Sequence, residues 1–154
     1  MKVSFDFDST LSRSDVQRFA KELVAAGHEV WIVTSRISNE QSKLEYTSNY
    51  TLDRIYKSNK KLFRVADNVG IKREHIIFCK FAPKIDFIKN NNFLFHLDDD
   101  SDELIAIMES KDPCKPINVE HSDWELDCRK IIEIEKYLEN PNKGYKRKIL
   151  NDNI

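Results

Sequence analysis

The sequence predicts one α/β domain, a doubly wound three-layer sandwich around a mainly parallel central sheet of about five strands. Two observations support this prediction. Short apolar runs typical of buried strands alternate along the chain with longer segments whose apolar residues recur at helical spacing. The chain has 154 residues, enough for one domain with a substantial core but too few for two comfortable ones. Strands that alternate with helices form parallel sheets with helices on their faces.

The first predicted unit is a strand, a helix and a second strand. The strands are expected at residues 2–7 and 29–33. Between them, one helix face is formed by apolar residues at helical spacing, namely Val16, Phe19, Ala20, Leu23 and Val24. Ser14 and Gln17 have the spacing of a capping box that would open this helix, and Gly27 can end it in the left-handed conformation.

The alternation continues through the rest of the chain. Further strands are expected at residues 75–79, 93–97 and 116–119, and further helices at 38–69, 84–89 and 101–109. Gly70 can end the long helical segment. Ser122 and Glu125 have the spacing of a second capping box, which predicts a last helix to about Leu138.

The C-terminal residues differ in composition from the rest. Residues 141–154 are rich in Asn and Lys, include the run Tyr145-Lys146-Arg147-Lys148, and lack hydrophobic periodicity. We therefore interpret 1–140 as the folded domain and 141–154 as a basic C-terminal tail. The tail adds a small weight toward a nucleic-acid partner.

Composition limits the class of protein. Hydrophobic residues make up 40% and charged residues 33%, which is ordinary for a soluble globular protein. No segment has the length and apolarity of a membrane span or a secretory signal, so we expect a cytoplasmic protein without membrane contact. The net charge of -1 gives no global case for a polyanionic partner. The three cysteines lack CxxC spacing and predict neither disulfides nor a zinc site.

Polar residues follow three of the predicted strands. They are Asp6-Phe7-Asp8-Ser9-Thr10 after the first, Thr34-Ser35-Arg36 after the second and Asp98-Asp99-Asp100 after the fourth. Ligands of parallel α/β sheets bind beyond the carboxyl ends of the strands, so these residues are candidates for a site. Carboxylates that converge there would repel each other unless a cation held them, and their oxygens suit Mg²⁺. Because successive strand residues alternate in direction, an extended chain would place Asp6 and Asp8 on one side.

The order of these motifs resembles the haloacid dehalogenase (HAD) superfamily of phosphohydrolases. Residues 3–11 look like its first motif, a hydrophobic strand that ends in DxDxT, although Ser9 stands where most members have glycine. Residues 30–34 look like the second motif, a strand that ends in Thr or Ser. Residues 93–99 look like the fourth, a strand that ends in paired acids. For the lysine of the third motif we choose Lys84, with Lys80 and Lys89 as rivals.

The resemblance implies a capless, Mg²⁺-dependent phosphatase with a HAD-like Rossmannoid fold. Its implied catalytic residues are Asp6 as nucleophile, Asp8 as general acid and base, Thr34 and Lys84. Its implied metal ligands are Asp6, Asp8 through its backbone carbonyl, Asp98 and Asp99, with Asp102 as an alternative to Asp99 through water. Ser9, Thr10, Ser35 and Arg36 would contact the substrate.

Other interpretations of these motifs stay open or are excluded. An Asp-x-Asp tripeptide alone is more often a solvated turn, and the acids of 98–103 could simply favour a helix start. A calcium loop that begins at Asp6 is excluded, because its sixth position is Leu11 and its twelfth is Gln17. A response-regulator receiver would carry its residues in another order. A binding module without catalytic activity, on the same fold, is the alternative of another class.

The substrate is constrained mainly by the space for a cap. The chain has no room for a cap domain after the first motif or after the third strand, so the resemblance implies an open site, unless residues 38–50 fold over it. An open site is compatible with bulky substrates, or with oligomers whose chains cover each other's sites. We rank a nucleotide or polynucleotide phosphate, such as a nucleic-acid end, before a phosphoprotein or a small metabolite.

Overall fold

Five parallel strands form a single sheet in the computed structural model, which describes residues 1–140. The strands are β1 (Lys2–Phe5), β2 (Glu29–Thr34), β3 (Ile76–Phe78), β4 (Phe95–Asp98) and β5 (Lys115–Asn118). Their order across the sheet is β3-β2-β1-β4-β5, and every neighbouring pair is parallel. The predicted α/β class and parallel sheet are confirmed. The predicted basic tail lies outside the described residues.

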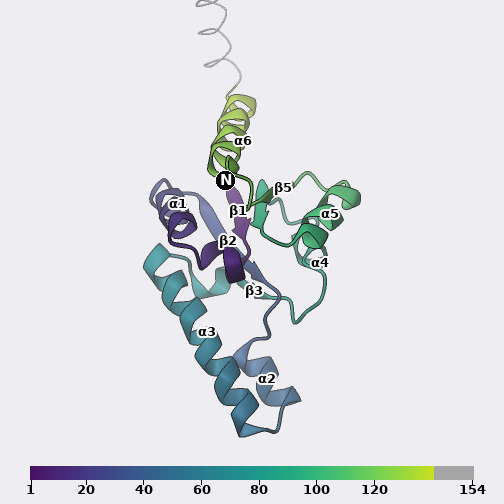
Figure 1. The fold of residues 1–154 in the computed structure, drawn as a ribbon. Helices are drawn as coiled ribbons and strands as arrows, with labels where there is room; N and C mark the ends of the chain where they lie inside the picture. Colours follow the sequence, from purple (N-terminus) through teal and green to yellow (C-terminus); the bar gives the residue numbers. More distant parts are fainter. Residues whose placement is uncertain (141–154) are drawn as a thin grey trace, which may run out of the picture.

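Helices cover both faces of the sheet, which gives three layers (Figure 1). One face packs against α1 (Ser14–Ala25), α3 (Asn49–Val69) and α6 (Trp124–Glu139). The other packs against α4 (Ile85–Ile88) and α5 (Ser101–Ser110). Aromatic contacts connect the layer of α1, α3 and α6 to the sheet. Phe19 of α1 makes T-shaped contacts with both Phe5 of β1 and Trp124 of α6. Such T-shaped contacts are favourable beyond the apolar area that they bury.

The chain reverses its direction of travel across the sheet at β1. From this central strand it moves outward through β2 and β3, and it then returns to the other side of β1 to form β4 and β5. Sheets with such a reversal usually bind their ligands beyond the carboxyl ends of the strands beside it. Asp6 directly follows β1, Thr34 ends β2 and Asp98 ends β4, so these three side chains start from adjacent strands.

A helical hairpin extends past this edge of the sheet. It consists of α2 (Asn39–Glu45) and the first half of α3, which Figure 1 shows beyond the ends of β2 and β3. Ser38 and Ser48 cap the two helices by accepting the amides of Gln41 and Thr51. The buried side chain of Asn59 donates to the carbonyl of Ile37 and to Asn39, at 2.9 Å each, and so fastens α3 to the start of the hairpin.

Glycines end two of the helices as predicted, whereas both predicted capping boxes are wrong. Gly27 and Gly70 have φ values of 88° and 94°, in the left-handed region after α1 and α3.

The two capping boxes fail because their side chains have other partners. Ser14 is already the first residue of α1, and Gln17 donates to the carbonyl of Ser12 instead. Asp123, not Ser122, precedes α6. Glu125 accepts from Arg18 of α1 and from Arg129 one turn further along α6, so its carboxylate is engaged elsewhere.

The three cysteines are buried and form no disulfide, as expected. Burial raises the pKa of the Cys79 thiol to about 12. Within residues 1–140, no helix combines the length and the apolarity that a bilayer crossing requires.

Candidate functional site

A buried lysine joins two carboxylates at the carboxyl ends of the central strands. Nζ of Lys84 lies 2.7 Å from Oδ1 of Asp6 and 2.7 Å from Oδ2 of Asp98, and all three side chains are at most 7% exposed. The amide of Asp6 donates to the carbonyl of Leu97 at 2.8 Å, which fixes the chain after β1 against β4. The amide of Lys84 donates to Glu103, which fixes the start of α4 against α5. The three charges therefore come from three rigid elements.

The structure separates Lys84 from the two rival lysines. Lys80 is exposed and forms an ion pair with Glu45 of α2, and Lys89 is exposed at the end of α4. Lys84 is the lysine of these three that lies beside the carboxylates.

A buried histidine supports Asp98 from inside the sheet. Nε2 of His96 lies 2.9 Å from Oδ2 of Asp98, and Nδ1 lies 2.8 Å from Oγ of Ser4. Burial lowers the pKa of His96, so the ring is neutral and can donate at Nε2 while it accepts at Nδ1. Burial alone would raise the pKa of Asp98, but the hydrogen bond from His96 and the contact with the charged Lys84 outweigh it and lower that pKa. The amide of Asp100 binds the other oxygen of Asp98. His96 thus holds Asp98 in position from within the sheet.

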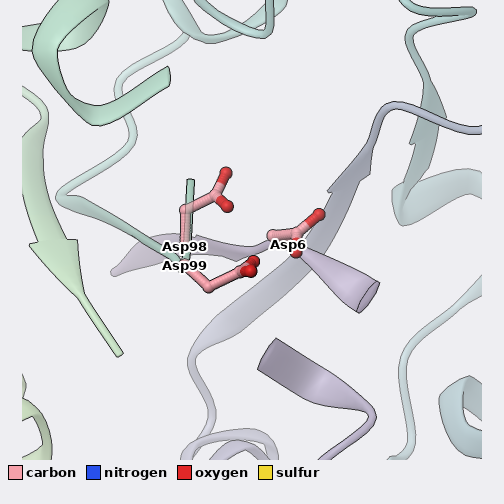
Figure 2. A group of neighbouring side chains, drawn as sticks. All are labelled: Asp6, Asp98 and Asp99. Carbon is pink, nitrogen blue, oxygen red and sulfur yellow. The ribbon is translucent and has the colours of Figure 1, made fainter. Parts of the chain in front are cut away.

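A third carboxylate completes an acidic cluster (Figure 2). Asp6, Asp98 and Asp99 each offer an oxygen within 4.8 Å of the others. Oδ1 of Asp99 accepts the hydroxyl of Thr10 at 3.3 Å. Burial, followed by the nearby charge of Asp98, raises the pKa of Asp6 to about 7, although Lys84 opposes this. One ammonium group therefore does not neutralise three carboxylates, and the oxygen ligands fit a divalent cation such as Mg²⁺. The residues present are compatible with the predicted metal.

Asp8 lies apart from this cluster. The expectation of an extended chain through Asp8 is wrong, because β1 ends at Phe5 and the irregular turn η1 (Phe7–Leu11) follows. Both oxygens of Asp8 accept from Arg36, with Nη2 at 2.7 Å and Nε at 2.9 Å. Nη1 of Arg36 also donates to the carbonyl of Ser58 in α3 at 2.7 Å. Arg36 thus links Asp8 to the helical hairpin, and the Asp8 side chain stays 60% exposed.

The smaller polar candidates occupy different positions near the carboxyl edge of the sheet. Thr34 is fully buried, and its hydroxyl oxygen accepts the amide of Arg36 at 3.3 Å. Ser35 is half-buried, and its carbonyl accepts the amide of Phe81. Ser9 is exposed with φ 58°, a left-handed conformation that glycine adopts more readily. Asp102 is exposed on α5 and does not belong to the acidic cluster.

A hollow of about 550 Å³ opens beside Asp8, and sequence reasoning missed most of its lining. Residues that were not predicted come from the helical hairpin and from the loop after β3, and include Tyr46, Arg54, Ile55 and Phe81. Tyr46 belongs to residues 38–50, the segment that could fold over the site, and it lines the hollow beside Asp8. Phe81 could have been found by the rule used for the other strands, since it follows the carboxyl end of β3.

Comparisons of the chain with models of protein families, with curated proteins and with solved structures found no significant match. The geometry of the site therefore carries the functional argument.

The raised pKa of Asp6 predicts a pH-dependent stability difference. In the folded, metal-free protein Asp6 holds its proton to about pH 7, whereas the unfolded chain releases it near the ordinary value of 3.8. The folded state binds more protons between these values, so this carboxyl lowers stability as the pH rises. The Asp6→Asn variant lacks this contribution. The free energy of unfolding of Asp6→Asn should therefore rise relative to that of the wild type between about pH 4 and pH 7.

Urea unfolding of both proteins in the presence of a chelator measures this difference. Burial lowers the pKa of His28 and of His96, which makes stability rise with pH in the same range, but both proteins share these groups. Asp67→Asn is the matched control, because Asp67 is exposed on α3. A difference between wild type and Asp6→Asn that stays constant with pH would contradict the prediction.

Proposed function

We propose that the protein is a Mg²⁺-dependent phosphomonoester hydrolase of the HAD type that works through an aspartyl-phosphate on Asp6. The observation that carries this proposal is the buried contact of Asp6 with Lys84 and Asp98, next to Asp99. A nucleophilic carboxylate needs a fixed position and nearby positive charge that offsets the charge of the arriving phosphoryl group. Lys84 provides both, because it holds one oxygen of Asp6 and leaves the other without a hydrogen bond from the described residues.

The acidic cluster would supply the metal site. Asp6, Asp98 and Asp99 would hold Mg²⁺, which would neutralise charge on the phosphoryl oxygens and help orient them. His96 keeps Asp98 in place through a neutral hydrogen bond. Supporting partners of this kind fix the direction of metal-binding carboxylates.

In the first step, an oxygen of Asp6 forms a bond to phosphorus while the bond from phosphorus to the leaving oxygen breaks. The leaving oxygen takes a proton from Asp8. In the second step, water attacks the phosphorus, gives its proton to Asp8, and releases inorganic phosphate and the free carboxylate of Asp6. Lys84 stays beside Asp6 in both steps.

Arg36 makes this role of Asp8 depend on substrate binding. Arg36 holds both oxygens of Asp8, so the guanidinium has to move before either oxygen can contact a leaving group. Phosphoryl oxygens are good partners for a guanidinium group, often in a bidentate arrangement. A substrate that attracts Arg36 would therefore release Asp8 next to the leaving oxygen.

Release of phosphate from p-nitrophenyl phosphate tests the proposal. We expect turnover with Mg²⁺ and loss of turnover when the ion is removed with EDTA, with recovery after Mg²⁺ is added back. A panel of nucleotides, 3′-phosphorylated oligonucleotides, phosphopeptides and sugar phosphates should be measured beside it. Failure to release phosphate from any member of this panel would favour a binding module without catalytic activity.

A further inference from the structure

The hollow beside Asp8 lies where the leaving group of a substrate would extend. Asp8 and Arg36 line it, and Asp8 is the residue to which we assign protonation of the leaving oxygen. Its volume of about 550 Å³ falls within the range of pockets that hold small organic ligands. Whatever is bonded to the phosphoryl group can therefore enter this hollow.

The lining combines flat and apolar side chains with a second guanidinium. Phe81 and Tyr46 are aromatic, Ile37 and Ile55 are aliphatic, and Arg54 of α3 is cationic. Phe81 is 73% exposed and Tyr46 is 37% exposed, so both rings have free surface. Aromatic rings and guanidinium planes are the groups on which proteins stack nucleobases.

The backbone holds Phe81 at the hollow in an unfavourable conformation. Lys80 and Phe81 have φ values of 51° and 63°, and a bulky residue is rarely found in this left-handed region. The amide of Phe81 donates to the carbonyl of Ser35 at 2.8 Å, and that of Lys80 to the carbonyl of Arg36 at 3.1 Å. An ion pair between Lys80 and Glu45 ties the same loop to α2.

This strain has no compensation from burial of the phenyl ring. Phe81 gains little hydrophobic stabilisation in the free protein, because most of its side chain faces solvent. Strained backbone conformations that the surrounding structure enforces occur most often at ligand sites. The conformation and the exposure together indicate that Phe81 is held ready for a ligand.

We propose that this hollow binds a nucleobase stacked on Phe81, and that the substrates of the protein are nucleoside monophosphates. The proposal rests on the proposed phosphohydrolase function and specifies its substrate class. A nucleobase offers a flat π face that can stack on Phe81, whereas a ribose ring is puckered and offers no such face. A hollow of this size has room for a base with its sugar, and a single aryl ring would leave much of it empty.

The kinetic test compares substrates that share a phosphoryl group but differ in the ring. Adenosine 5′-monophosphate and its 3′ isomer carry the base, ribose 5-phosphate lacks it, and a phosphotyrosine peptide carries an aryl ring. One of the two nucleotides should exceed ribose 5-phosphate in kcat/KM by about tenfold or more, within the range of about 5- to 150-fold known for base stacking on one aromatic residue.

Variants of Phe81 connect this preference to the hollow. Phe81→Ala should lose about tenfold in kcat/KM for the preferred nucleotide and less than about twofold for ribose 5-phosphate. Phe81→Tyr keeps the ring and should retain the preference. Tyr137→Ala removes a half-exposed aromatic ring from α6, far along the chain from the hollow lining, and should change neither value. Equal losses on both substrates in Phe81→Ala, or a preference for phosphotyrosine, would overturn the proposal.

A binding measurement separates this proposal from the proposed function. Calorimetry with Asp6→Asn and adenosine 5′-monophosphate reports on the hollow without turnover. One outcome is that Asp6→Asn binds the nucleotide, Asp6→Asn/Phe81→Ala does not, and the wild type hydrolyses none of the substrates. That outcome would support the nucleobase site and contradict the hydrolase function. Hydrolysis of many phosphomonoesters without a preference for the nucleotide would contradict the nucleobase site and support the hydrolase function.

Discussion

Asp6→Asn should abolish phosphate release, with a fall in kcat of about 10⁴-fold or more, comparable to the loss of a nucleophile in other covalent enzymes. The amide is a poor nucleophile toward phosphorus, so the covalent step cannot occur. The variant should still fold, because Asn can accept a hydrogen bond from Lys84 and removes a carboxylate whose pKa is already raised to about 7. Asp6→Asn should therefore lose activity and remain folded.

Rapid acid quench of the reaction with a radiolabelled substrate measures the predicted intermediate. The wild type should carry label that hydroxylamine releases, as expected of an acyl phosphate, and Asp6→Asn should carry none. Asp67→Asn is again the control, because it makes the same chemical change on the exposed surface of α3. Retention of normal activity by Asp6→Asn would exclude the mechanism.

Much of the fold follows from local sequence signals. The strands and long helices were predicted because their apolar periodicity is strong, and Gly27 and Gly70 mark helix ends whose φ values favour glycine. The capping boxes were wrong because spacing alone does not show which partner a side chain will choose. Glu125 satisfies the spacing, yet its carboxylate binds an arginine of another helix as well as one of its own.

The candidate site was predictable only in part. The rule for parallel sheets identified Asp6, Thr34 and Asp98, because their positions depend only on where strands end. The direction of Asp8 was not predictable, since it depends on the irregular turn Phe7–Leu11 that replaces the end of the predicted strand. The hollow was also missed. The hollow depends on how far α2 and α3 extend past the sheet, and the spacing of hydrophobic residues does not determine this. The catalytic roles themselves stay predictions.

Lys84 illustrates the same limit and has the largest expected effect on stability. Three lysines precede β4, at positions 80, 84 and 89, and the sequence did not separate them. Lys84 lies in the core between two carboxylates, whereas Lys80 and Lys89 are exposed. Removing one partner of a buried ion pair is strongly destabilising, because the other charge stays buried without compensation.

Lys84→Met should lower the free energy of unfolding by about 3–5 kcal/mol in the metal-free protein. Met has a similar length and leaves no large cavity, so the loss reflects the two carboxylates that remain buried without their cation. The folded variant can relieve the repulsion by taking up a proton, which raises the pKa of its carboxyls above those of the unfolded chain. Its stability should therefore fall further as the pH rises through neutrality.

Urea unfolding of Lys84→Met at about pH 8, beside Lys80→Met and Lys89→Met, measures this effect, and the two surface variants should stay within about 0.5 kcal/mol of the wild type. Mg²⁺ provides a second measurement. A divalent ion bound by Asp6, Asp98 and Asp99 would replace the missing positive charge, so added Mg²⁺ should restore more stability to Lys84→Met than it adds to the wild type. Equal stability of the three lysine variants would show that the buried ion pairs do not form in solution. Destabilisation of Lys84→Met without any response to Mg²⁺ would leave the ion-pair network intact but contradict the metal site, because the same three carboxylates would then have no affinity for the ion.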